Sequence, residues 1–309
     1  IVKIFDLTVA TTGLNAKQLQ RYGVAFHSSI TESADHASYY PGATRMMIKL
    51  LYAPEKGRLL GAQIVGINGV DRIIGVLATA LKAGMTVFDL EHLELAYAPP
   101  YGEAKDPVNI AGYVAGNALR GDTDLVQWDQ VAHRDQSEYG LLDVRTEIEW
   151  GLGHIGEAQN IPLEELRERV GELDRDRPWV VYCKMGQRGY FAERFLRQKG
   201  FRVSNLSGGS KLYLAATAKQ SNYDEWQAQP STVGHPRLAL DKAWSGNVSD
   251  AAAIVVDACG LQCPGPIMAV YKRMQEMEVG QVLKVMATDP GFARDIGAWC
   301  ESTGNHLID

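Results

Sequence analysis

The sequence has 309 residues, of which 46% are hydrophobic and 22% are charged, and its formal net charge is −6. This composition predicts ordinary globular cores in two or three domains, and the acidic balance argues against a nucleic-acid partner, because nucleic-acid binders usually carry a basic face. Four cysteines are too few for a secreted disulfide framework, and the sequence has neither a signal peptide nor an apolar run long enough to span a bilayer. We therefore expect a cytoplasmic protein without a membrane partner.

Residues 1–120 have the pattern of mixed strands and helices. The expected strands cover residues 24–27, 46–52 and 59–66. The last two are joined by a turn at 53–57, which predicts a hairpin, and apolar residues at helical spacing predict a helix over 70–81 that ends near Gly84. The chain starts in an apolar stretch without an initiator methionine, so we expect it to be the later part of a longer protein.

Four motifs in this region suggest a family: residues 5–14, 39–42 (Tyr-Tyr-Pro-Gly), 97–101 (Tyr-Ala-Pro-Pro-Tyr) and 105–109 (Lys-Asp-Pro-Val-Asn). Together they resemble the C-terminal dimerisation domain of flavin-dependent disulfide reductases, in the branch of coenzyme A disulfide reductase and NADH oxidase. The resemblance implies a homodimer formed through residues 1–120. It also implies that tyrosines are lent to the partner subunit's active site, and the matching residues are Tyr40, or its neighbour Tyr39, and Tyr97. The alternative is that these aromatic side chains only pack a subunit interface.

The flavin half of such a reductase is not in this sequence. No Gly-x-Gly-x-x-Gly opens a strand, turn and helix unit, so neither dinucleotide-binding fold is expected here. We expect no cofactor and no metal bound within the chain. The resemblance places FAD, NAD(P)H and coenzyme A in a full-length protein.

A polar turn at 121–124 introduces a second pattern, in which strands alternate with helices. The expected strands cover residues 141–145, 179–182 and 201–206, and the expected helices cover 162–173 and 187–199. This order predicts a mainly parallel sheet covered on both faces, with sites at the carboxyl ends of the strands.

Cys183 stands at such a strand end and just before a helix, where unpaired backbone N–H groups and the positive helix end favour a thiolate. Lys184 and Arg188 add positive charge to the turn. From these residues alone, Cys183 is either a nucleophile or a buried structural cysteine.

Residues 121–228 resemble the rhodanese family in several motifs. The first signature is matched by residues 143–146 (Asp-Val-Arg-Thr), 149–150, 153–155 and 158–162, and the catalytic loop by 183–188. The resemblance implies that Cys183 accepts sulfur as a persulfide while Arg188 and the loop amides hold the anion; the loop residues are Lys184, Met185, Gly186 and Gln187. Four residues between cysteine and arginine suit a single sulfur atom, whereas the related phosphatases have one residue more. Asp143 and His154 are expected to make structural hydrogen bonds rather than act in catalysis.

Residues 229–249 have the spaced prolines and glycines of a linker. A third segment, 250–309, follows; strands are expected at 254–256 and 282–286, a helix over 290–300 and a further strand beginning at 306. It resembles the TusA-like (SirA-like) sulfur carriers in Cys-Pro-Gly-Pro at 263–266 and Ala-Thr-Asp-Pro-Gly-Phe at 287–292. The resemblance implies that Cys263, at the amino end of a helix, carries a persulfide, and that the sequence ends before the family's last strand.

The other two cysteines have weaker signals. Cys259 lies four residues before Cys263, but there is no second cysteine pair and proline follows Cys263, so a metal site or disulfide is poorly supported. A resolving thiol remains the candidate role of Cys259. Cys300 is expected in a core.

These observations predict an α/β and α+β multidomain sulfurtransferase that relays sulfane sulfur between Cys183 and Cys263, within a reductase of persulfides, polysulfide or coenzyme A disulfide. The expected partners are small donors and acceptors, including thiosulfate and coenzyme A-linked thiols, and a sulfur-acceptor protein. The alternative is a dimeric scaffold that carries sulfur without turnover. A phosphatase at Cys183 is disfavoured by the loop length.

Overall fold

The computed structural model describes residues 1–135, 137–218, 254–261, 265–278, 281–289, 292–303, 305 and 307–308. The chain divides into two compact units, residues 1–216 and 217–309. The predicted linker at 229–249 and the predicted carrier residue Cys263 both lie outside the described residues.

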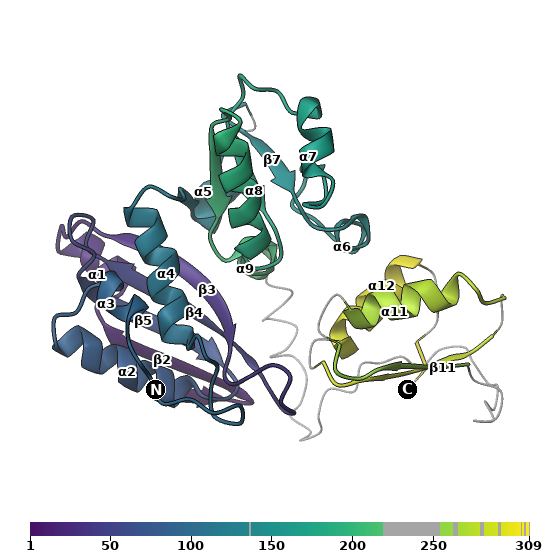
Figure 1. Ribbon diagram of the computed structural model, residues 1–309, viewed down its shortest axis with the longest axis horizontal. Coiled ribbons are helices and arrows are strands. Elements are labelled where there is room, and N and C mark those ends of the chain that lie inside the picture. The colour runs from purple at the N-terminus through teal and green to yellow at the C-terminus, as the bar shows by residue number, and fades with distance from the viewer. Residues whose placement is uncertain are drawn as a thin grey trace, which may run out of the picture. The chain divides into compact units, whose positions relative to one another are not determined.

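The first sheet is antiparallel, and strands that pair in it are not always consecutive in the sequence. Its strand order is β1 (Val2–Ile4), β2 (Leu7–Gly13), β5 (Leu59–Gly66), β4 (Arg45–Tyr52) and β3 (His27–Ala34). The helices of this region are α1 (Ala16–Arg21), α2 (Val70–Lys82), α3 (Val87–Glu91) and α4 (Pro107–Leu119). Helices α2 and α4 pack on the sheet (Figure 1), and one apolar core joins them to it through residues such as Ile48, Ile64, Ile73 and Leu77.

The hairpin and the helix predicted in this region are confirmed. β4 and β5 pair antiparallel across the turn at 53–57, and α2 spans the predicted helix, with Gly84 beyond its end at φ +74°. The strand predicted at 24–27 is wrong, because β3 begins only at His27 and runs to Ala34. Its sequence is rich in serine and threonine, yet Ser29, Thr31 and Ser33 are buried, so packing rather than apolar character forms the strand.

The second sheet is parallel at every pairing. Its order is β6 (Leu125–Val126), β10 (Val203–Leu206), β9 (Trp179–Tyr182), β7 (Gly140–Asp143) and β8 (Gln159–Asn160). Its helices are α5 (Trp128–Ala132), α6 (Glu147–Gly151), α7 (Leu166–Arg169), the 3-10 turn η1 (Val170–Glu172), α8 (Gln187–Gln198) and α9 (Gly209–Thr217). Separate apolar clusters cover the two faces, one around Val181 and Leu196 and one around Val180 and Leu206, which confirms the predicted doubly covered sheet.

The helix predicted over 162–173 is shorter than expected. The N–H of Leu163 donates to the carbonyl of Val144 at 3.1 Å, so the chain there extends the sheet edge before α7 begins at Leu166. Residues 151–156 do contain Gly-x-Gly-x-x-Gly, but this motif begins at the last residue of helix α6 and precedes strand β8, which is the reverse of a dinucleotide-binding turn.

The second unit is small. Strands β11 (Ile254–Ala258) and β12 (Leu283–Ala287) pair in parallel and are accompanied by α11 (Gly265–Met274) and α12 (Phe292–Thr303). Cys300 is buried beside Trp299, as predicted. The strand expected from residue 306 is wrong for Leu307 and Ile308, which are exposed and outside any strand. Across the described residues of both units, no helix has the length and apolar character needed to cross a membrane.

Candidate functional site

The turn between β9 and α8 brings a thiol and backbone N–H groups together. Cys183 follows the last residue of β9 and is 3% exposed. Gly186 caps α8 at φ +112°, a conformation that favours glycine, and its N–H donates to Cys183 Sγ at 3.1 Å. The sulfur therefore lies against a backbone donor at the helix start, which stabilises negative charge.

Carbonyl groups of this turn accept hydrogen bonds from residues of α9 and β10. The N–H groups of Ser210 and Lys211, in the first turn of α9, donate to the carbonyls of Cys183 (2.9 Å) and Lys184 (3.1 Å). Asn205 Nδ2 donates to the Gly186 carbonyl at 3.0 Å. Because a trans peptide points its C=O and the following N–H in opposite directions, these bonds orient the loop amides as well as the carbonyls.

Two glycines permit this close packing. A Cβ on Gly209, which has φ +63°, would lie 2.4 Å from the carbonyl oxygen of Cys183. A Cβ on Gly189 would lie 2.3 Å from Asn205 Oδ1. The loop shape thus depends on residues from α8, β10 and α9 as well as on its own sequence.

Arg188 makes a two-bond ion pair with Glu149. Its Nη1 and Nη2 donate to Glu149 Oε2 and Oε1, each at 2.7 Å, and the Glu149 side chain is 5% exposed. Burial would raise the pKa of Glu149, but the paired guanidinium holds that pKa below its ordinary value. The role of Arg188 in holding an anion stays a prediction, and its charge is balanced by Glu149 in this structure.

The sequence places Glu149 in a signature motif but does not predict its ion pair with Arg188. Glu149 is also the N3 residue of a capping box on α6, where Thr146 is the N-cap, and the spacing Thr-x-x-Glu is visible in the sequence. That spacing predicts a helix start only. Its contact with Arg188, 39 residues further along the chain, needs the folded sheet.

The ion pair between Glu149 and Arg188 gives a testable pH dependence. A carboxyl whose folded pKa is depressed adds stability that is present above its unfolded pKa, ordinarily 4.5, and is lost as the pH falls through the folded value. We expect Glu149→Gln to lower the free energy of unfolding by about 1–3 kcal/mol at pH 7, and this difference to shrink at pH 3 to 4. Urea unfolding of both proteins at the two pH values measures it.

The matched control for that prediction is Glu172→Gln. Glu172 also pairs with an arginine, Arg169 at 2.7 Å, but both side chains are substantially exposed. We expect little change in its unfolding free energy at either pH, because solvent screens exposed pairs. Equal losses of unfolding free energy in Glu149→Gln and Glu172→Gln would contradict the prediction that the buried ion pair contributes more stability than the exposed one.

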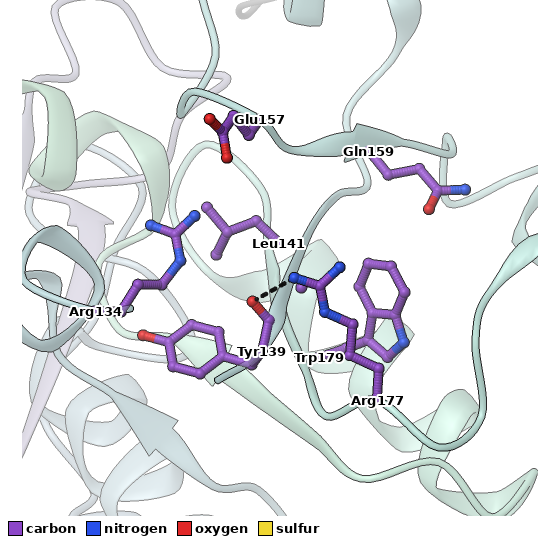
Figure 2. A pocket seen from close by; sticks show the side chains of 8 residues that line it. Arg134, Tyr139, Leu141, Glu157, Gln159, Arg177 and Trp179 are labelled. Atoms are coloured by element: carbon purple, nitrogen blue, oxygen red, sulfur yellow. Dashed lines mark hydrogen bonds between the residues drawn. The ribbon is translucent and has the colours of Figure 1, made fainter. Parts of the chain in front are cut away.

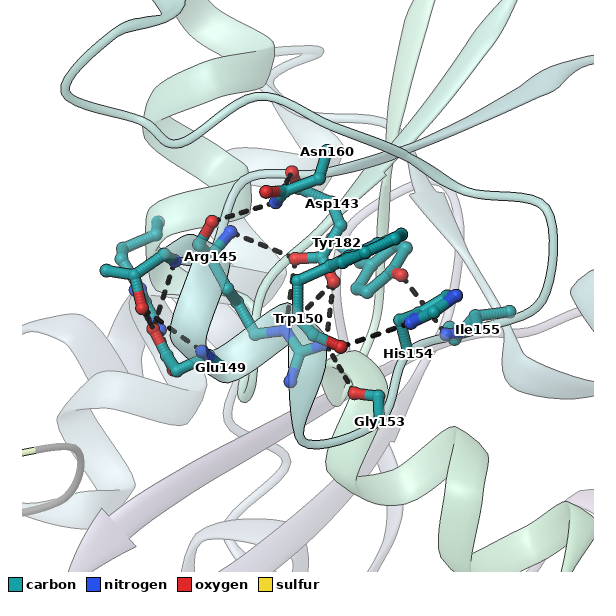
Figure 3. A network of polar contacts seen from close by, with 11 residues as sticks. Asp143, Arg145, Glu149, Trp150, Gly153, His154, Ile155, Asn160 and Tyr182 are labelled. Carbon is teal, nitrogen blue, oxygen red and sulfur yellow. Dashed lines mark hydrogen bonds and ion pairs between the residues drawn. The ribbon is translucent and has the colours of Figure 1, made fainter. Parts of the chain in front are cut away.

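Residues of the first signature form a network of polar contacts around the buried Asp143 and Arg145 (Figure 3). Asp143, whose side chain is fully buried, accepts from Arg145 Nε at 3.0 Å and Nη2 at 2.6 Å, and Arg145 Nη2 also donates to the Gly153 carbonyl at 2.8 Å. His154 stacks on Trp150 with ring centroids 4.0 Å apart, and its Nδ1 lies 3.1 Å from the Trp150 carbonyl. Asp143 and His154 therefore make structural contacts, as the sequence predicts.

The tyrosines predicted to reach a partner subunit lie on the surface of the first unit. Tyr39, Tyr40 and Tyr97 are all exposed, and Tyr39 is the most exposed of the three. A hydrogen bond with Tyr97 raises the pKa of Tyr39. The structure brings together Tyr39 and Tyr97, whereas Tyr40 packs its ring edge-on against His36.

The cysteines of the second unit differ in environment. Cys259 is exposed, and the Asp257 side chain, which bonds with it, raises its pKa and so favours the thiol over the thiolate. Burial likewise raises the pKa of Cys300. The resolving role of Cys259 stays a prediction.

A cavity of about 150 Å³ lies at the other end of the parallel strands. Arg134, Tyr139, Arg177 and Trp179 are among the residues that surround it (Figure 2). Trp179 begins β9, whereas Cys183 follows its end, so this cavity contains none of the predicted site residues.

Three family models match successive parts of the chain. Residues 1–108 match the dimerisation domain of pyridine nucleotide-disulphide oxidoreductases, residues 129–216 match the rhodanese-like domain, and residues 254–309 match sulfurtransferase TusA. Coenzyme A disulfide reductases of Staphylococcus haemolyticus (strain JCSC1435) and Staphylococcus aureus (strain bovine RF122 / ET3-1) are each 39% identical over 115 residues, which is 37% of this chain and 26% of theirs.

Two solved structures each match about two thirds of this chain. The reduced Bacillus anthracis CoADR-RHD is 47% identical with a TM-score of 0.67, and covers 69% of this chain and 38% of its own. A NAD-dependent persulfide reductase from A. fulgidus is 38% identical with a TM-score of 0.62, over 68% of this chain and 38% of its own. The chain spans about a quarter of the length of the curated relatives it matches.

Proposed function

We propose that this chain, which combines a pyridine nucleotide-disulphide oxidoreductase dimerisation domain, a rhodanese-like domain and a TusA domain, moves sulfane sulfur through cysteine persulfides. Cys183 is the first station. The observation that carries the proposal is the contact of its Sγ with the Gly186 N–H at 3.1 Å. The carbonyls of Cys183, Lys184 and Gly186 accept hydrogen bonds from α9 and β10 and so leave this N–H to the sulfur.

The transfer is a thiolate displacement. With thiosulfate as donor, Cys183 Sγ attacks the sulfane sulfur, the sulfur–sulfur bond of thiosulfate breaks, and sulfite leaves with the electron pair. A second nucleophile, such as cyanide or a thiolate, then attacks the outer sulfur of the persulfide and releases Cys183 as thiolate. No oxidant or reductant is consumed. The low exposure of Cys183 favours small donors.

Cys263 is proposed as the second station. The support comes from the sequence motif Cys-Pro-Gly-Pro and from the TusA match over residues 254–309. The raised pKa of Cys259 favours its thiol over its thiolate, which makes Cys259 a weak nucleophile at neutral pH. In this proposal sulfur passes between Cys183 and Cys263 or from each to an acceptor protein.

The wider activity proposed is reduction of persulfides, polysulfide or coenzyme A disulfide by a protein of which this chain is a part. The names of the two kinds of relative, coenzyme A disulfide reductase and persulfide reductase, support it. FAD and NAD(P)H would then bind residues outside this chain, because no described strand here is followed by a Gly-x-Gly-x-x-Gly turn that opens a helix. Residues 1–108 would form the homodimer contact, and Tyr39 with Tyr97 would face the partner subunit.

Mass spectrometry tests the persulfide proposal directly. The reduced protein is incubated with thiosulfate or polysulfide, and intact and peptide masses are recorded. We expect one added sulfur atom on the peptide that contains Cys183, and one on the peptide that contains Cys263 when polysulfide or loaded Cys183 is present. Absence of added sulfur from both peptides would refute the relay, and loading that always needs an added donor enzyme would favour the carrier alternative.

A further inference from the structure

The edge strand of the first sheet receives hydrogen bonds from residues of the second sheet region. Strand β3 is at the edge, so its outer backbone groups need partners from elsewhere. The N–H of Ile30 donates to Ser207 Oγ at 2.9 Å, and the Ser28 carbonyl accepts from Gln127 Nε2 at 3.0 Å. The side chains of Gln127 and Ser207 thus take up two outer backbone groups of this edge strand.

An ion pair also joins helix α9 to strand β3. Lys211 Nζ, in α9, lies 2.5 Å from Glu32 Oε1, in β3. The Glu32 side chain is only 3% exposed, and its other oxygen, Oε2, is buried without a hydrogen bond among the described residues. A carboxylate removed from water in this way depends strongly on its one cation.

Lys211 also holds the Cys183 loop through its backbone. Its N–H donates to the Lys184 carbonyl at 3.1 Å, next to the bond from Ser210 N–H to the Cys183 carbonyl. Peptide planarity then directs the Met185 N–H away from α9. A second contact joins the loop to the first sheet, since Arg45 Nη1 lies 4.0 Å from Met185 Sδ.

We infer that Lys211 is a positioning residue, which uses its ion pair with Glu32 to fix α9 against the dimerisation domain and thereby fixes the backbone of the Cys183 loop. The inference rests on the proposed function, since a sulfur-accepting loop is what gains from being held. It makes the reactivity of Cys183 depend on Glu32 in β3, which lies 151 residues earlier in the chain (183 less 32).

The test is the rate at which iodoacetamide alkylates Cys183, recorded from pH 5 to 9 by peptide mass spectrometry. In Lys211→Met we expect alkylation about tenfold slower at pH 7, with the midpoint pH of the profile displaced, because small misplacements of reacting groups carry large rate costs. Lys211→Arg keeps the charge and should restore the rate to within about twofold of the unsubstituted protein. Glu32→Gln should match Lys211→Met, and serves as the second route if Lys211→Met does not fold.

Arg169→Met is the matched control, because it removes an exposed arginine paired with Glu165 and Glu172 in the same domain. It should alkylate at the original rate. Alkylation of Lys211→Met at the original rate, or equal slowing in Lys211→Arg, would overturn the inference. Sulfur loading of the unsubstituted protein from thiosulfate is measured in parallel. If Cys183 is alkylated but gains no sulfur, the proposed function is contradicted. The comparison of alkylation rates among the variants still decides whether Lys211 positions the loop.

Discussion

Cys183→Ser is expected to abolish sulfur transfer from thiosulfate to cyanide, with a fall in kcat/KM on the order of a thousandfold or more. The hydroxyl of serine is a weak nucleophile at neutral pH and forms no persulfide, and no other described cysteine of the first unit could replace the thiol. The measurement is thiocyanate formation under initial-rate conditions, with circular dichroism to verify that the variant is folded.

The control for this experiment is Cys300→Ala. Cys300 is buried beside Trp299, and burial raises its pKa, so it is expected to take no part in transfer. Turnover by Cys300→Ala should stay within about twofold of the original. Undiminished turnover in Cys183→Ser would show that sulfur transfer does not take place at the loop between β9 and α8.

Asp143→Ala is expected to be the most destabilising of the substitutions considered, with a loss of about 3–5 kcal/mol in the free energy of unfolding. It leaves the Arg145 guanidinium, 7% exposed, without the carboxylate that accepts from its Nε and Nη2. A buried cation without a partner is costly, and the same change removes the acceptor for the Arg145 N–H at 2.9 Å. Urea unfolding monitored by tryptophan fluorescence measures the loss.

A double substitution separates the charge from the packing. Asp143→Leu with Arg145→Met removes both members of the pair, and apolar replacement of a buried pair is often near neutral. We expect this double variant to be more stable than Asp143→Ala. A double variant as unstable as the single one would show that the network of Figure 3 matters through its hydrogen bonds to Gly153 and the backbone rather than through the pairing of charge.

Much of the candidate site is local in the chain, which is why the sequence predicted it. Loop length, a strand before Cys183 and a helix after it are all set within about twenty residues, and the observed β9, Gly186 and α8 follow the expected order. The predicted helix at 162–173 and the strand at 24–27 are placed less well. The Leu163 N–H donates to the Val144 carbonyl at the sheet edge, and the Val24 N–H donates to the Leu19 carbonyl at the end of α1, so these hydrogen bonds override the apolar spacing.

The contacts that shape the site join residues far apart and leave no periodic signal. Glu149 reaches Arg188 across 39 residues, and Lys211 reaches Glu32 across 179. Charged residues in a sequence indicate a solvated surface by default, so neither carboxylate could be identified as buried before the fold was known. The choice of Tyr39 over Tyr40 as the partner of Tyr97 likewise depends on which way each side chain leaves the backbone.

The sequence by itself therefore determined the thiol, the length of its loop and the order of the three segments, because these depend on residue types at short, fixed spacings. Only the tertiary structure decided what holds that loop: the carbonyls of Cys183 and Lys184 bound by α9, Arg188 paired with Glu149, and α9 tied to β3 by Lys211 and Glu32. These interactions form between elements that meet when the sheets pack, and burial gives them their strength.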